Sequence, residues 1–95
     1  MECAEIQISG HAFRKMFARS ISIVDVKQVA LNGEIIKTYP DDKPYPSQLI
    51  FHIVNSRPIH VVVARDISNG ICIIVTAYIP EVGIWSDDFK TKIKK

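Results

Sequence analysis

The sequence has few cysteines, and neither its cysteines nor its histidines form a familiar metal or nucleophile motif. Cys3 and Cys72 make no CxxC pair and are too few for a disulfide framework, so we expect two reduced, partly buried thiols. The three histidines show no HExxH or other paired His–carboxylate spacing. A glycine-rich phosphate loop and a GxSxG motif are also missing. The chemistry left is acid–base catalysis without a metal or other cofactor, or simple binding.

Long apolar runs and a strong net charge are missing as well. The longest apolar run, ICIIV, is about a quarter of a membrane span, and the N-terminal MECAEIQ has no apolar signal region. We therefore expect a cytoplasmic protein with no membrane partner. Twelve Lys and Arg against ten Asp and Glu give a net charge of +2, too small to indicate nucleic-acid binding by itself. Any electrostatic function must be local.

Two helices are predicted near the N-terminus. In SGHAFRKMFARS, with Ser9 as N-cap, one arc of the helix is apolar and the complementary arc is basic. The apolar arc holds Ala12, Phe13, Met16 and Phe17, and the basic arc holds His11, Arg14, Lys15 and Arg19. ISIVDVKQVALNG is typical of a second helix, with Ser22 as N-cap, Asp25 in the capping-box position and Gly33 at the stop.

The remainder predicts a sheet. EIIKTY, QLIFHIV, IHVVVARD and GICIIVTAYI have the length and β-branched content of strands. Their short connections favour antiparallel neighbours. We therefore predict an α+β fold for one domain over residues 1–95, with two N-terminal helices followed by a four-stranded antiparallel meander. The C-terminal EVGIWSDDFKTKIKK is expected to pack on this sheet, with Trp85 and Phe89 as one apolar ridge.

The first helix carries the sharpest chemical pattern. His11 in the first turn is biased toward a neutral imidazole, which accepts protons, by the helix N-terminus and Arg14. Arg14, Lys15 and Arg19 would attract a phosphodiester. A base beside an oxyanion stabiliser is what RNA cleavage through its own 2′-hydroxyl requires. The alternative is a basic face that is only solvated.

Two further histidines flank the NSRP turn. With an even loop His60 lies opposite Ile53 and the imidazoles of His52 and His60 point to opposite faces, whereas a three-residue loop pairs His52 with His60. The sequence leaves this register open. His60 is either a catalytic partner or a satisfied core histidine. Thr76 and Tyr78 near a strand end are candidate substrate contacts, or simple packing residues.

Several separated segments carry a family resemblance. ISGHAFRKMFARSISIVDVKQVALNGEII, RPIHVVVA, IIVTAYIP and WSDDFKTK together resemble the bacterial domain of unknown function 4258 family, a branch of the barnase, EndoU, colicin and RelE-like superfamily of RNase toxins. The matching positions are His11, Arg14, Arg19, Gly33, Pro58, His60, Thr76, Tyr78, Trp85, Asp88, Phe89, Lys90 and Lys92. Lys92 stands where arginine is common, and Ser20 where glycine often follows the second arginine.

The resemblance implies a fold of helices followed by a four-stranded antiparallel sheet, and a toxin role beside a zinc-ribbon-type antitoxin protein. From it and the residues together we predict a metal-independent endoribonuclease that leaves a 2′,3′-cyclic phosphate. His11 and His60 would be acid and base, Arg14 and Arg19 the phosphate clamp, and Lys15, Thr76, Tyr78, Lys90 and Lys92 substrate contacts. The alternative is a non-catalytic domain that binds protein or nucleic acid, with Trp85 and Phe89 as an exposed anchor. A homodimer is left open.

Overall fold

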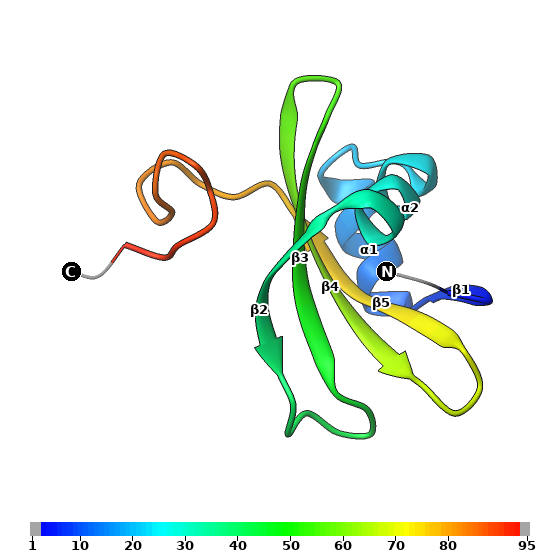
Figure 1. Cartoon of the computed structure of the whole chain (residues 1–95). Coiled ribbons are helices and arrows are strands. Elements are labelled where there is room, and N and C mark those ends of the chain that lie inside the picture. The colour runs from blue at the N-terminus through cyan, green and yellow to red at the C-terminus, as the bar shows by residue number, and fades with distance from the viewer. Residues whose placement is uncertain (1–2, 94–95) are drawn as a thin grey trace.

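The computed structural model describes residues 3–93, which fold around one five-stranded sheet (Figure 1). The elements are β1 (Glu5–Ile8), α1 (Gly10–Ala18), α2 (Ile23–Asn32), β2 (Glu34–Tyr39), β3 (Ser47–Val54), β4 (Arg57–Asp66) and β5 (Ile71–Tyr78). The strand order is β1-β5-β4-β3-β2, in which β2 to β5 form an antiparallel meander and β1 pairs with β5 in parallel. The α+β class is confirmed. The strand count of four is wrong, because the sheet is mixed and has a fifth strand.

The missed strand β1 is short and lies at the edge of the sheet. Its sequence EIQI alternates between exposed and half-buried residues, and a run of four residues gives little periodicity to detect. Its pairing partner is more than sixty positions away, since Ile6 lies beside Cys72 and Ile8 beside Ile74. β1 therefore forms because β5 offers it a free edge, and local propensity alone could not indicate this.

The pairing of β1 with β5 also overturns the prediction of two reduced thiols. Cys3 and Cys72 form a disulfide, with their Cα atoms 5.6 Å apart. No spacing in the sequence indicates this bond, because it depends on the long-range pairing of β1 with β5. Disulfides persist mainly in oxidising environments, so the bond gives no support to the cytoplasmic location expected from the sequence.

The predicted helix caps are confirmed, but the predicted apolar face of α1 is too wide. The hydroxyls of Ser9 and Ser22 accept the backbone N–H groups of Ala12 and Asp25, 3.0 Å away in each case. Ala12 and Met16 are buried, whereas Phe13 is 55% and Phe17 84% exposed. A helix of nine residues that packs on β5 buries only a narrow stripe, so the outer half of the apolar arc faces solvent.

The two faces of the sheet have different covers. On β4, Ile59, Val61 and Val63 point toward the helices and join the core cluster that contains helix residues Ala12 and Val26. Because side chains alternate along a strand, His60 and Val62 point to the opposite, helix-free face. The C-terminal segment, residues 81–93, lies on this second face, across the sheet from α1 and α2 (Figure 1). The expectation that it packs on the sheet is met.

Within residues 3–93, neither helix has the length and apolar character needed to cross a membrane.

We predict that the disulfide is a major source of stability. Cys3→Ser should lower the free energy of unfolding by about 2–4 kcal/mol, because the bond closes a loop with a sequence separation of 69 and so restricts the unfolded chain. Urea denaturation without reductant measures this. Under reducing conditions the variant and the wild type should unfold at nearly the same urea concentration. Two thiols that react with a thiol reagent in the folded, unreduced wild type would contradict the bond.

Candidate functional site

The site is built on one row of paired residues across four strands. Glu34 on β2 faces Phe51 on β3, Phe51 faces His60 on β4, and His60 faces Tyr78 on β5. Paired residues share a face of the sheet, so all four lie on the helix-free face. The C-terminal segment crosses this row, which therefore becomes the floor beneath that segment.

His60 is the centre of the row and is fully buried, at 0% exposure. The Trp85 ring packs edge-on against the imidazole with the centroids 4.4 Å apart. Nε2 lies 2.7 Å from the carbonyl oxygen of Phe89, and Nδ1 lies 3.2 Å from the hydroxyl of Tyr78. Since a carbonyl only accepts, Nε2 carries the proton. In the neutral ring Nδ1 is then an acceptor, and the Tyr78 hydroxyl donates to it.

Burial controls the protonation of both side chains of the hydrogen-bonded pair, His60 and Tyr78. Loss of solvent lowers the pKa of His60 below its ordinary value of 6.5, and the hydrogen bond to the Phe89 carbonyl offsets only part of this. Burial also raises the pKa of Tyr78 above 10.0; Tyr39 raises it further, while Arg19 lowers it. Near pH 7 the pair is therefore a neutral imidazole and a protonated phenol, with the phenol proton directed at Nδ1.

The β3–β4 turn settles the register that the sequence left open. Asn55 and Ser56 have φ values of 51° and 66°, which form a two-residue hairpin loop of the kind that matches strand twist. His60 then lies opposite Phe51, and His52 lies opposite Ile59 on the helix side. The even-loop prediction that the imidazoles point to opposite faces is confirmed. The partner predicted for His60, Ile53, is wrong because β4 begins at Arg57, inside the NSRP segment.

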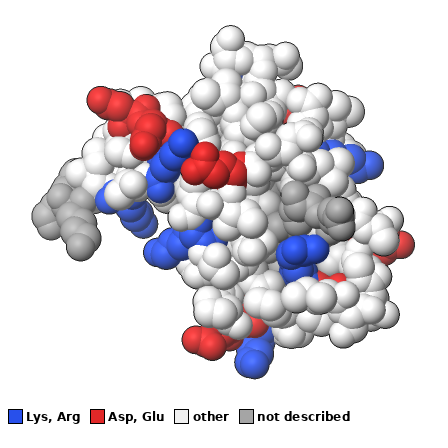
Figure 2. Space-filling model, viewed as in Figure 1, with Lys and Arg blue, Asp and Glu red and all other residues white. Residues whose placement is uncertain are grey.

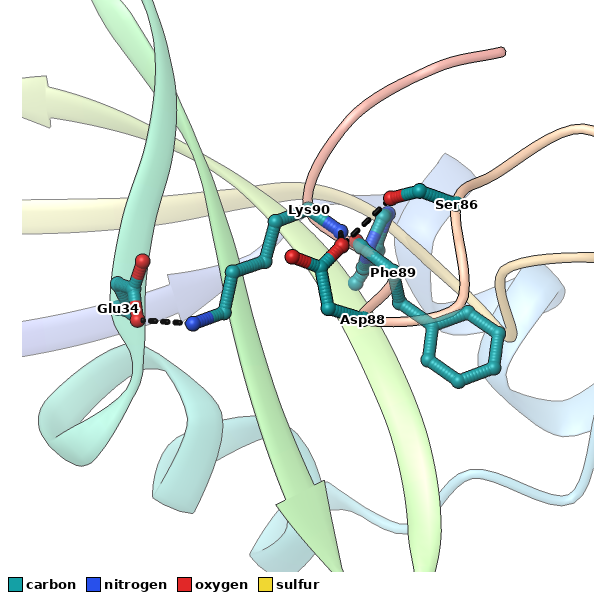
Figure 3. A network of polar contacts seen from close by, with 6 residues as sticks. Glu34, Ser86, Asp88, Phe89 and Lys90 are labelled. Atoms are coloured by element: carbon teal, nitrogen blue, oxygen red, sulfur yellow. Dashed lines mark hydrogen bonds and ion pairs between the residues drawn. The ribbon is translucent and has the colours of Figure 1, made fainter.

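A tight turn shapes the C-terminal segment over the row. The Asp88 carboxylate accepts hydrogen bonds from the Ser86 hydroxyl and from the backbone N–H of Lys90, which lower the pKa of Asp88. Phe89 follows with φ 61°, a left-handed conformation that costs a bulky residue free energy, and its carbonyl meets His60. Figure 3 shows Lys90 extended across to the sheet, where Nζ lies 3.0 Å from Glu34 Oε1.

Between this segment and the sheet lies a cavity of about 370 Å³, which we call the lysine cavity. It is lined by Ile36, Lys37, Tyr39, Leu49, Tyr78, Trp85, Lys90, Thr91 and Lys92. Lys37 reaches it because a bulge between Ile35 and Lys37 shifts the register of β2, and its Nζ lies 5.4 Å from the centre of the Tyr39 ring. Basic and acidic side chains lie side by side where the segment meets the sheet (Figure 2). The cavity therefore combines three cations with three aromatic rings.

A smaller hollow of about 180 Å³ adjoins the lysine cavity, and we call it the Arg19 hollow. Its walls are Arg19, Tyr78, Ile79, Glu81, Ile84 and Trp85. The Arg19 guanidinium is held by a 2.9 Å hydrogen bond from Nη1 to the Ala77 carbonyl. Arg57 fixes the adjoining backbone, since it donates to the carbonyls of Ser20 at 3.1 Å and Arg19 at 3.3 Å. Ser20 has φ 54°, which explains why glycine suits this position.

The structure brings together only some of the residues predicted from the sequence. Arg19, His60, Tyr78, Lys90 and Lys92 meet around the two hollows. His11, Arg14 and Lys15 lie exposed on α1, across the sheet from the lysine cavity. His11 and Arg14 therefore do not meet His60 in one hollow. Thr76 lies on the helix-free face opposite Val62 but is not among the residues that line the lysine cavity.

Sequence reasoning missed four residues of the site. Lys37 and Tyr39 read as part of an ordinary strand, and only the bulge turns Lys37 toward the cavity. Glu34 and Arg57 gave no signal, because their partners Lys90 and Arg19 are distant in sequence.

The Trp85 and Phe89 ridge faces the sheet, with Trp85 on His60 and Phe89 on Phe51, so it is not the exposed anchor proposed for a binding domain. Within residues 3–93, no group of three or more His, Cys, Asp or Glu could hold a metal ion.

The chain matches a known protein family. The model of the family described as a domain of unknown function (DUF4258) matches residues 8–79. The match contains α1, α2 and β2 to β5 but ends before the segment that carries Trp85, Phe89, Lys90 and Lys92. No curated protein and no solved structure matches the chain. The strand row that forms the floor of the site thus lies within the matched region, and the C-terminal segment that covers this row lies outside it.

We predict that the buried imidazole makes stability depend on pH. Because the pKa of His60 is lower in the folded protein than its ordinary value of 6.5, the unfolded chain binds more protons as the pH falls through and below 6.5. The free energy of unfolding should therefore fall over that range.

Urea denaturation from pH 7.5 to pH 5 measures this dependence. His60→Gln should be less stable at pH 7.5 and lose much of the slope, whereas the control His52→Gln should keep it. Equal slopes in the wild type and both variants would show that His60 does not titrate with a lowered pKa.

Proposed function

The chain belongs to the DUF4258 family, and from that premise we propose that it is a metal-independent endoribonuclease whose reaction takes place in the lysine cavity. The family description assigns no activity, so the proposal rests on the site. The observation that carries it is Tyr78, a residue of the cavity wall whose hydroxyl donates its proton to the buried neutral imidazole of His60. An oxygen held in this way has its lone pairs free to accept a proton from a substrate hydroxyl.

The arrangement supports cleavage through the 2′-hydroxyl of RNA. The 2′-oxygen attacks the adjacent phosphorus, so that the O2′–P bond forms and the P–O5′ bond breaks. The 2′-hydroxyl proton passes to Tyr78 Oη while the phenol proton passes to His60 Nδ1. The leaving 5′-oxygen takes a proton from water, and the imidazolium later returns its proton to solvent. The products are a 2′,3′-cyclic phosphate and a 5′-hydroxyl.

The surrounding groups suit the charge that develops in this reaction. The Phe89 carbonyl, 2.7 Å from Nε2, stabilises the imidazolium. Lys37 and Lys92 line the cavity, and their positive charges would attract the phosphate and its developing negative charge. The charge of Lys90 is shared with Glu34, so Lys90 serves mainly to hold the C-terminal segment in place.

The wider biological part of the proposal comes from the resemblance alone. It comprises membership of the RelE-like and barnase-like toxin superfamily, a cytoplasmic toxin role, and a zinc-ribbon-type antitoxin as partner. The meander of β2 to β5 after two helices supports the superfamily likeness, whereas the parallel strand β1 is an addition to the implied four-stranded sheet.

One observation favours the second candidate, a non-catalytic domain that binds protein or nucleic acid. His60 is at 0% exposure beneath Trp85, so substrate reaches it only through Tyr78. A buried histidine with both nitrogens satisfied is also what a purely structural role would show. In that case the lysines would bind an anionic partner without cleaving it.

Cleavage of a labelled single-stranded RNA in EDTA separates these candidates. The wild type should cleave, and Tyr78→Phe should be slower by about 10²-fold or more, because the proton acceptor is lost while the ring is kept. Lys37→Gln should weaken RNA binding, and Lys27→Gln, with the same charge change on exposed α2, should not.

The outcomes are distinct. Binding without cleavage by the wild type would favour the non-catalytic domain. Cleavage that is lost in His11→Ala but kept in Tyr78→Phe would move the active site to the exposed face of α1 and overturn the proposed relay.

A further inference from the structure

The lysine cavity and the Arg19 hollow share a wall. Tyr78 and Trp85 line both of them, so these two residues form a partition between the two spaces. On one side of this partition lie three lysines with Tyr39, and on the other lies the Arg19 guanidinium. A ligand that crosses the partition would meet cations on both sides and the Tyr78 hydroxyl between them.

The two spaces differ in what they can hold. At about 370 Å³ the lysine cavity falls within the range of small-ligand pockets, roughly 300–1,000 Å³. Its aromatic walls offer π-faces on which a nucleobase can stack. The Arg19 hollow, at about 180 Å³, lies below that range, so it suits a single group and not a whole nucleotide.

Arg19 is prepared to bind a phosphate. Its Nη1 is anchored on the Ala77 carbonyl, and its backbone is anchored by Arg57, so the guanidinium is held in place before a ligand arrives. Only one of its five N–H donors is needed for the anchor, and those that remain match two phosphate oxygens. Glu81 lines the same hollow, and its carboxylate is an acceptor for a sugar hydroxyl.

We propose that the two hollows are consecutive subsites for one unpaired RNA strand, with a base in the lysine cavity and the phosphate on the 3′ side of that nucleotide on Arg19. The inference rests on the proposed function for its substrate class, and it adds the direction in which the strand crosses the site. A base enters a walled cavity only when it is unpaired, so the substrate is single-stranded RNA. The bridging phosphodiester then lies at the Tyr78–Trp85 partition.

The single tryptophan of the chain, Trp85, reports on both subsites by its fluorescence. The first probe is an adenine dinucleotide that has a 5′-phosphate and whose first sugar lacks the 2′-hydroxyl. It cannot be cleaved, and its second sugar keeps its hydroxyls. The second probe is 5′-AMP, which has no phosphate on its 3′ side and therefore fills only the lysine cavity. The dinucleotide should bind more tightly than AMP.

Substitutions at the two subsites should have different effects. Arg19→Gln should weaken the dinucleotide by about tenfold, as expected for one charge-assisted contact, and weaken AMP less than twofold. The affinity of Arg19→Lys for the dinucleotide should lie between those of Arg19→Gln and the wild type, because lysine keeps the positive charge but cannot bind two phosphate oxygens in the bidentate geometry of a guanidinium. Lys37→Gln should weaken both probes, and Lys27→Gln should weaken neither. Far-ultraviolet circular dichroism checks that each variant is folded.

The result separates this inference from the proposed activity. Arg19-dependent dinucleotide binding by a protein that does not cleave RNA would keep the two subsites and remove the catalysis. If Arg19→Gln weakens AMP as much as the dinucleotide, or if neither probe changes the fluorescence, the consecutive subsites are overturned, whether or not RNA is cleaved.

Discussion

The buried imidazole of His60 is the interaction on which the rest of the site depends. Its two nitrogens connect elements that are distant in sequence, since Nε2 holds the Phe89 carbonyl of the C-terminal segment and Nδ1 holds the Tyr78 hydroxyl of β5. The first bond places the cover of the lysine cavity, and the second orients the group that we propose to be reactive. The neutral tautomer with its proton on Nε2 satisfies both nitrogens, Nε2 as a donor and Nδ1 as an acceptor, so one protonation state is compatible with both arrangements.

The local features of the fold could be predicted from the sequence because they depend on neighbouring residues. Ser9 and Ser22 cap their helices, Gly33 follows the second helix, and the four strands of the meander lie where β-branched residues cluster. The features that could not be predicted are long-range. The edge strand β1 exists only beside β5, and the Cys3–Cys72 bond exists only because of that pairing.

In the candidate site, too, local features could be predicted from the sequence and long-range contacts could not. A basic helix face is conspicuous in a sequence, so His11 and Arg14 dominated the prediction, but a helix displays its polar face to solvent by default. The hollow forms elsewhere, where a cross-strand row on the helix-free face meets the C-terminal segment. The sequence indicates Tyr78 and Lys92 as substrate contacts but not why they meet. The contacts of Trp85 with His60 and of Phe89 with Phe51 place the C-terminal segment over the row and so bring them together.

The most direct test is a long-range ¹H–¹⁵N correlation spectrum of the histidine side chains at pH 7. We predict that His60 is a neutral imidazole with its proton on Nε2 and an unprotonated Nδ1 that accepts a hydrogen bond, and that the Tyr78→Phe variant changes the Nδ1 shift. An imidazolium, or a neutral ring with the proton on Nδ1, would contradict the orientation of the Tyr78 proton and with it the proposed relay.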